Sequence, residues 1–279
     1  MQMATGPIVS DKRRKSSRIM LRVNPFIRRT IGPLAVLLIW HVASTYGWVD
    51  ARFVPAPLTV LKSLNQWMFG PPGAGPYSGT WFIHAGYSSY RVFGGFLVAS
   101  VFGVVIGCIV GWSRLMSDLL DPIIQIVRPI PITAWVPFAV IFFGIRDASA
   151  FFLIALGAFF PIAINTAAGV AGTPALLVRA ARMLGIRPHN ILLRVVLPSA
   201  MPFIFTGLRL GIGLAWVLVI VAEMMAVKSG LGFAMWDAYY FLRMDIIIAA
   251  MLSVGMLGFL SDLFIKAISN HVLRWSRGL

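Results

Sequence analysis

The sequence predicts an all-α integral membrane protein with six transmembrane helices. Hydrophobic residues make up 59% of its 279 residues and charged residues only 12%, whereas charged residues are roughly a quarter of an average soluble domain. The mean hydropathy is +0.86. Six apolar stretches are each close to the ~20 residues that a helix needs to cross the hydrocarbon of a bilayer. These observations place the chain in a membrane.

The six expected spans follow one another along most of the chain. They cover residues 31–49, 88–112, 122–144, 148–170, 202–226 and 246–268. An even number of spans puts both termini on the same side of the membrane. Residues 50–87, between the first two spans, contain FVPAP and GPPGAGPYSG, and we expect them to form a polar loop broken by glycine and proline.

The distribution of Lys and Arg predicts the orientation of the spans, because positive residues are retained on the cytoplasmic side. Sixteen of the 24 Lys and Arg residues lie on one side, eight of them within residues 1–30, and five lie on the other. Both termini are therefore expected in the cytoplasm. The chain divides into a basic cytoplasmic segment, residues 1–30, and a transmembrane domain, residues 31–279.

The third span is expected to bend or break. Within it stand Pro122, Pro129, Pro131 and Pro137, and each proline removes a backbone donor and clashes with the preceding helical turn. Irregular backbone at membrane depth persists only where protein or a water-filled cavity surrounds it. This favours a transport pathway over a passive membrane anchor.

The composition and motifs disfavour several classes of function. The net charge of +15 is not arranged as the basic face or aromatic sheet motif of a nucleic-acid-binding protein, so no nucleic acid partner is expected. The single cysteine, Cys108, excludes an intrachain disulfide. Four scattered histidines without HExxH give no metal or hydrolytic site, and no P-loop ending in Lys-Ser/Thr occurs. Any energy must therefore come from a partner or from an ion gradient.

A basic loop joins the fourth and fifth spans. Thr173 is placed to cap a helix that Pro174 begins and Gly185 ends. Pro188 then begins a second helix, which Pro198 interrupts. The loop is expected on the cytoplasmic side. Its arginines suit two roles, contact with anionic lipid headgroups or docking of another protein, and the residues alone leave both open.

Seven residues of this loop stand at the positions of a known sequence motif. Within residues 171–199 they are Arg179, Ala180, Ala181, Gly185, Val195, Leu197 and Pro198. The order resembles Glu-Ala-Ala, three residues, Gly, nine residues, Ile-x-Leu-Pro, which is the cytoplasmic coupling loop of ATP-binding-cassette (ABC) importer permeases. Arg179 replaces Glu and Val195 replaces Ile. Because the first change reverses a charge, a contact that the family makes through this Glu is not carried over to Arg179.

Further segments extend the likeness over residues 50–270. FVPAP, RPIPITAWVPFAVIFFG, AARMLG and SGLGFAMWDAYYFLRMDIIIAAML are similar to the subfamily that imports nitrate, taurine, aliphatic sulfonates and bicarbonate. The resemblance implies the type I ABC importer permease fold, a place in the bacterial inner membrane, and a transport subunit without its own ATP site. It also implies a second permease copy, two ATPase subunits that hold ATP and Mg²⁺, and an extracytoplasmic substrate-binding protein.

The resemblance also assigns a role to the loop residues. The loop would dock on the ATPase and pass on its closure through Arg179, Ala180, Ala181, Arg182, Gly185, Leu197 and Pro198. No cofactor and no metal ion is expected in this chain.

Polar residues within the expected spans are candidates for a substrate pathway, since such residues are costly in lipid. They are Gln125, Arg128, Thr133, Trp135, Asn165 and Glu223. Arg128 suits a bidentate contact with an anion or a contact with a lipid headgroup. Glu223 suits an outer gate or an ion pair with Lys228 or Arg243. Arg209 is expected to extend to the cytoplasmic interface.

An ion-gradient-driven secondary transporter or channel is the alternative to the importer. Its proton or sodium sites are usually acids buried inside the membrane. Here the acids fall near span ends, at Asp121, Asp147, Glu223, Asp245 and Asp262. The favoured hypothesis is therefore the permease subunit of an ATP-driven importer, with a small anion as its cargo.

Overall fold

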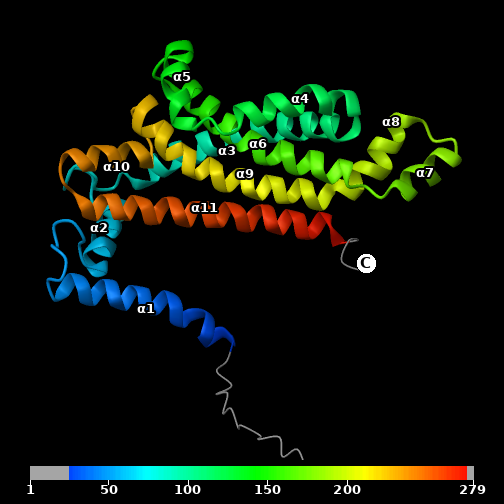
Figure 1. Ribbon diagram of the computed structural model, residues 1–279. Helices are drawn as coiled ribbons and strands as arrows, with labels where there is room; N and C mark the ends of the chain where they lie inside the picture. Colours follow the sequence, from blue (N-terminus) through cyan, green and yellow to red (C-terminus); the bar gives the residue numbers. More distant parts are fainter. Residues whose placement is uncertain (1–24, 275–279) are drawn as a thin grey trace, which may run out of the picture.

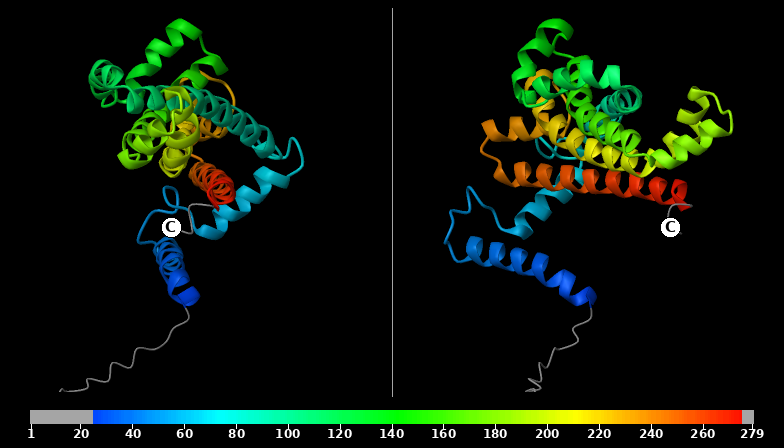
Figure 2. Two further views of the ribbon diagram at one scale, coloured as in Figure 1. Left: turned by 90° about the vertical axis from the view of Figure 1, so that its right-hand side faces the viewer. Right: turned by 45° about the vertical axis from the view of Figure 1, so that its right-hand side comes forward.

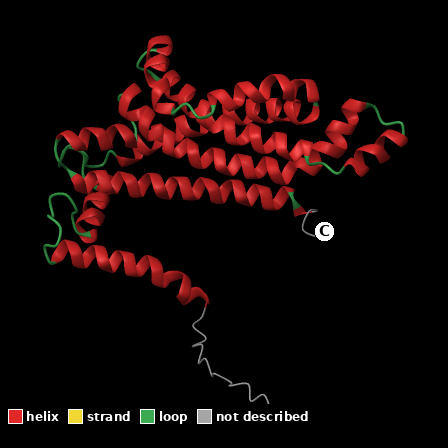
Figure 3. Ribbon diagram, in the orientation of Figure 1, coloured by secondary structure: helices red, strands yellow, loops and turns green. Residues whose placement is uncertain are grey.

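The computed structural model describes residues 25–274, with side chains from Thr30 onward, and these residues form helices and no strand (Figure 3). The all-α prediction is confirmed. Four of the described helices are long and apolar enough to cross a membrane, namely α3 (Trp81–Trp112), α6 (Asp147–Ala171), α9 (Leu197–Ala226) together with the turns before it, and α11 (Met244–Val272). They correspond to the second, fourth, fifth and sixth expected spans. Most of the basic N-terminal segment lies outside the described residues.

The long helices run side by side (Figure 1). α6 makes extensive contact with both α3 and α9, and α11 packs along α9. The basic loop carries α7 (Ala175–Met183) and α8 (Pro188–Ile191) beyond one end of the bundle, here called the loop end. α10 (Leu231–Tyr240) lies at the opposite end, here called the α10 end.

The third expected span is broken, as its prolines predict. Its parts are α4 (Arg114–Val127), a 3-10 turn (Ile132–Trp135) and α5 (Val136–Phe143). The two halves are bent by 91°, and α5 projects from the bundle (Figure 1). Pro129 and Pro131 stand in the break, whereas Pro122 lies inside α4 without ending it.

The first expected span stands apart from the others. α1 (Pro25–Thr45) lies away from the long helices, and α2 (Pro57–Phe69) connects it to them (Figure 2). Among the described side chains its apolar part covers only Thr30–Thr45. With the bent pair taken as one span, the described residues contain five long apolar spans and this shorter helix. In the part of the chain that the structure describes, length and composition alone therefore do not reach the expected six.

Residues 50–87 are not simply the expected loop, because α2 occupies their centre. Pro57 stands in the first turn of α2, where a missing N–H costs nothing. Val60 and Trp67 are buried in the main core, so tertiary packing supports this helix. In the irregular stretch that follows, the Tyr77 hydroxyl donates to Asp237 of α10 (2.8 Å). Burial, together with this carboxylate, raises the pKa of Tyr77.

Candidate functional site

The basic loop folds into two short helices, as predicted. The bounds of α7 lie within one residue of the expected 174–184, and Gly185 ends it with a φ of 72°, which glycine adopts without steric cost. The predicted cap is wrong. Pro174 holds the N-cap position, and the Thr173 hydroxyl instead donates to the Gly169 carbonyl of α6 (3.4 Å).

One face of α7 is held by the protein and the other is free. Ala181 is buried in an apolar cluster with Ile191 and Val196. The free side and the tip of the loop present Arg179, Ala180, Arg182, Met183, Leu184 and Gly185. Met183 and Leu184 are 87% and 79% exposed. An exposed apolar tip with arginines beside it is typical of a surface that contacts another protein.

The second helix of the loop is not interrupted at Pro198, contrary to the prediction. α8, a π-helical turn (Leu192–Val196) and α9 follow one another without a break, so that residues 188–226 form one helix of 39 residues. The wide π-helical turn lies directly before Pro198 and gives its ring room beside the preceding carbonyl groups. Leu197 and Pro198 are half-buried at this junction. The loop is therefore continuous with a membrane-spanning helix.

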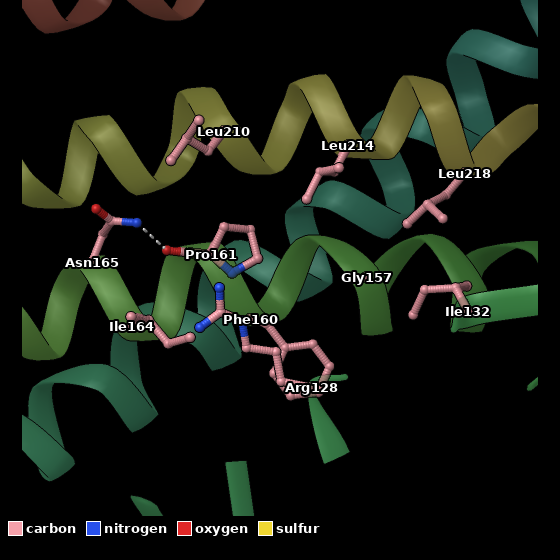
Figure 4. A pocket seen from close by; sticks show the side chains of 10 residues that line it. All are labelled: Arg128, Ile132, Gly157, Phe160, Pro161, Ile164, Asn165, Leu210, Leu214 and Leu218. Atoms are coloured by element: carbon pink, nitrogen blue, oxygen red, sulfur yellow. Dashed lines mark hydrogen bonds between the residues drawn. The ribbon is translucent and has the colours of Figure 1, made fainter. Parts of the chain in front are cut away.

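A cavity of about 320 Å³ lies between α6, α9 and the broken third span (Figure 4). Its wall on α9 consists of Leu210, Leu214 and Leu218, which point toward α6. The polar groups in its lining are Arg128, from the residue that follows α4, and Asn165 of α6. The structure thus brings together two of the six candidate pathway residues.

Arg128 and Asn165 differ in whether their side chains already form hydrogen bonds within the protein. Asn165 donates through Nδ2 to the Pro161 carbonyl (2.7 Å), as Figure 4 shows. The guanidinium of Arg128 is exposed and forms no ion pair with another described residue. The cavity therefore offers an uncompensated positive charge, with an amide and leucine side chains around it.

The other candidates on the broken span do not line this cavity. Gln125 and Thr133 are exposed elsewhere. Trp135 packs against Phe138 and Phe152, and its buried Nε1 has no hydrogen-bond partner among the described residues. These three residues flank the break without converging on one site.

Glu223 has a partner that the sequence analysis missed. It is fully buried and pairs neither with Lys228 nor with Arg243, but with Arg91 of α3 (Nη1 to Oε1, 2.8 Å). Its other oxygen accepts from the Ser88 hydroxyl and the Gly232 amide, both at 2.9 Å. The carboxylate is thus fully hydrogen-bonded, and this excludes the two predicted ion pairs.

Arg91 joins three parts of the protein at the α10 end. It is 1% exposed, its Nε donates to Asp147 at the start of α6 (2.7 Å), and its other nitrogens donate to Ser229 in the α9–α10 connection (both 2.6 Å). The signal in the sequence is an arginine inside a predicted span, a position that is costly without partners. Its partners are far away in the chain and give no local pattern.

Comparison with known proteins decides the family. Residues 99–274 match the family described as the binding-protein-dependent transport system inner membrane component. This match covers the broken span, the cavity helices and the basic loop. The chain belongs to the ABC importer permeases.

Curated relatives place the permease in the expected subfamily. The putative aliphatic sulfonates transport permease of Bacillus subtilis is 35% identical, over 87% of this chain and 85% of its own. The taurine transport system permease of Escherichia coli is 36% identical, over 88% and 89%. The nitrate import permease of Synechocystis is 35% identical, over 97% and 98%. The predicted resemblance is confirmed.

A solved structure supports the type I importer fold of the permease. The MetNI methionine ABC transporter, in an inward-facing conformation, matches with a TM-score of 0.57 over 67% of this chain and 95% of that chain, at 18% identity. At this identity the match shows the fold alone. Together with the family match and the relatives, this fold makes the permease a multi-pass membrane component of a transport system.

Arg209 of the permease is tied to a neighbouring helix. Its Nε and Nη2 donate to the two oxygens of Asp262 on α11, both at 2.8 Å. Both side chains remain partly exposed. Arg209 thus has an acidic partner on α11 that the sequence alone did not indicate, and its extension to the cytoplasmic interface stays a prediction.

Proposed function

We propose that the permease forms the pathway of an ATP-driven importer for a small anion, with a sulfonate, taurine, nitrate or bicarbonate as the cargo class. The names of the relatives and the unpaired guanidinium of Arg128 support an anion. Two copies of the permease, two ATPase subunits and an extracytoplasmic binding protein form the complete importer. ATP and Mg²⁺ are held by the ATPases, and the loop end and both termini face the cytoplasm of a bacterial cell.

The observation that carries this proposal is the free face of α7, whose other face packs through Ala181 on Ile191 and Val196, at the start of a helix that continues into a span. Arg179, Ala180 and Arg182 are exposed there, while Ala181 fixes α7 to the loop core. A displacement of α7 would therefore move the 39-residue helix, which extends from the loop to the cavity wall. Closure of the ATPase pair would in this way change the cavity, and the alternation between two states follows from differential binding.

The cavity then acts as a passing point for the anion. A guanidinium such as Arg128 binds an oxyanion through two parallel N–H donors. The leucines of α9 add no further donor, so the cavity holds an anion weakly enough to release it. Trp135 packs against Phe138 and Phe152 beside the break. Glu223 holds α3 and α10 together at the α10 end through its ion pair and hydrogen bonds.

Co-purification with the ATPase tests the docking role of α7. We expect Arg179→Glu with Arg182→Glu to abolish both co-purification and anion-stimulated ATP hydrolysis, because an acidic partner surface on the ATPase would then face acidic residues. The measurement is ATP hydrolysis by the complex after coexpression with the ATPase. Arg114→Glu with Lys266→Glu, two exposed residues outside the loop, makes the same charge change and should leave both readouts intact.

Two results would overturn the proposal. One is equal loss in the loop variant and the control, which would show a general charge effect. The other is substrate flux that persists without ATP and without a copurifying ATPase. The ion-gradient-driven transporter would then take the place of the importer.

A further inference from the structure

A second cavity lies at the α10 end of the permease, away from the Arg128 cavity. Its volume is about 590 Å³, and it is formed where the first turns of α3, the start of α6 and the α9–α10 connection meet. The residues that line it are Tyr87, Arg91, Ile145, Arg146, Asp147, Ala148, Val227, Lys228 and Ser229. Three of these nine residues are cationic and one is acidic.

The three cations of this cavity are not equivalent. Arg91 is buried and forms ion pairs with Asp147 and Glu223. Arg146 and Lys228 are exposed, and neither side chain forms an ion pair or hydrogen bond with another described residue. With both carboxylates counted, one positive charge remains. The two cations that are free to bind stand on separate segments that Arg91 holds together.

The backbone adds to the positive potential. α6 begins at Asp147, directly after Arg146, and a helix N-terminus carries a partial positive charge and unpaired N–H groups. Tyr87 forms an apolar wall, with its ring 5.5 Å from the Arg91 guanidinium carbon. A concave site with two free cations and a helix N-terminus suits a compact oxyanion rather than a cation or an apolar molecule.

We propose that this cavity is a binding site for a small oxyanion, held by Arg146 and Lys228 over the rigid Arg91. Its role rests on the proposed function: the site receives the anion at the α10 end before the anion reaches the Arg128 cavity. Asp147 of this site and Gly157 of the Arg128 cavity are ten residues apart on α6, which is about 15 Å along a helix. The two sites therefore lie in succession along α6.

Protection of Lys228 from chemical modification tests the site without requiring transport. The full chain in lipid nanodiscs is treated with an amine-reactive reagent, and the rates at Lys228 and at the exposed Lys62 are followed by mass spectrometry. We expect sodium methanesulfonate or sodium nitrate to slow modification of Lys228 but not of Lys62. Sodium chloride at equal ionic strength controls for screening. The proposal would be overturned if the oxyanions slowed modification of Lys228 no more than chloride does, or slowed Lys62 to the same extent.

A variant of Arg146 shows whether the two cations act together. We expect Arg146→Gln to raise the methanesulfonate concentration for half-maximal protection of Lys228 about tenfold, because a charge-assisted contact is lost. Arg146→Lys should restore most of the effect. Protection unchanged in Arg146→Gln would contradict a shared site.

Transport separates this inference from the proposed function. In proteoliposomes with the ATPase and the binding protein, Arg146→Gln with Lys228→Gln should raise the KM for anion uptake and leave the maximal rate unchanged. Arg52→Gln with Lys62→Gln removes two exposed cations outside the cavity and should change neither. If the double variant instead weakens docking of the binding protein in its anion-free form, the cavity is a protein contact and the inference fails. If the native complex shows no ATP-dependent uptake, the proposed function is overturned. Protection of Lys228 would still test the anion site in that case.

Discussion

Arg91 and Glu223 meet with almost no access to solvent. Their side chains are 2% and 0% exposed, whereas those of the pair Arg243–Asp245 are 44% and 15% exposed. Desolvation of two charges is costly and is offset only when the remaining donors and acceptors also have partners. Here Ser88, Asp147, Ser229 and Gly232 supply those partners. Removing one member would therefore leave a buried charge without compensation.

Substitution of Arg91 tests this cost. We expect Arg91→Met to lower the free energy of unfolding by about 3–5 kcal/mol, because Glu223 is left buried and unpaired. The double variant Arg91→Met with Glu223→Met should recover part of the loss. The measurement is the midpoint of thermal unfolding in one detergent, compared across the variants.

The half-exposed pair provides the control for this prediction. Arg243→Gln removes the ion pair between Arg243 and Asp245, whose charged atoms are 2.8 Å apart. Exposed ion pairs contribute only about 0–1 kcal/mol to stability, so the loss should be small. If Arg91→Met and Arg243→Gln shift the unfolding midpoint equally, the buried network has no special role in stability.

At the scale of elements, the contact between α3 and α6 depends on small residues of α3. Gly95, Ala99, Gly103, Gly107 and Gly111 are spaced four residues apart and buried or half-buried. Such spacing lets two helix backbones approach closely in a membrane, where packing rather than the hydrophobic effect joins helices. This spacing was visible in the sequence, but its partner helix was not.

Adding one methyl group tests this contact. A Cβ at Gly107 would stand 2.5 Å from the Ala163 carbonyl oxygen and 2.6 Å from the Thr166 Cβ. We therefore expect Gly107→Ala to lower stability by about 1–3 kcal/mol, the usual cost of overpacking. The readout is the thermal unfolding midpoint.

Gly86 is the matched control on the same helix. No atom lies within 4 Å of an added Cβ there, and alanine is favoured over glycine in a helix by up to ~1 kcal/mol. Gly86→Ala should therefore leave the midpoint unchanged or raise it slightly. An equal loss of stability at both glycines would contradict a specific cost of the contact with α6, because helix propensity favours alanine at both positions.

At the scale of the whole molecule, the proposed pathway is open on one side. Arg128 is exposed at its cavity, and on the same wall Leu210 and Leu214 are 52% and 43% exposed. An unpaired guanidinium inside the membrane is costly unless protein or water surrounds it. A second copy packed over this side of α9 would enclose the cavity and complete the pathway.

Cysteine cross-linking tests this arrangement. Gly213 lies on the exposed side of α9 with no atom within 4 Å of an added Cβ. In a Cys108→Ser background, we expect Gly213→Cys to give a covalent dimer with a short bifunctional maleimide, detected by denaturing gel electrophoresis. Phe259→Cys, on the exposed face of α11, should remain monomeric. Dimers only from Phe259→Cys would place the partner on the other side.

Some of this protein follows from its sequence alone, because the physical causes act over a few residues. Apolar length determined the long spans. Pro129 and Pro131 determined the break in the third span, since a missing donor disrupts only its own helical turn. Gly185 determined the end of α7 through its left-handed conformation. The spacing of the basic loop motif identified the family, which the comparisons confirm.

Other features were decided only by the tertiary structure. Glu223 and Arg91 are 132 residues apart, and no local pattern tells which buried cation reaches which carboxylate. Of six candidate pathway residues, packing brought Arg128 and Asn165 to one cavity and left Gln125 and Thr133 outside it. The same holds for α2: the prolines and glycines of residues 50–87 suggested a loop, whereas burial of Trp67 supports a helix. Local chemistry sets where helices begin, bend and end, whereas the partners of their side chains depend on how the helices pack.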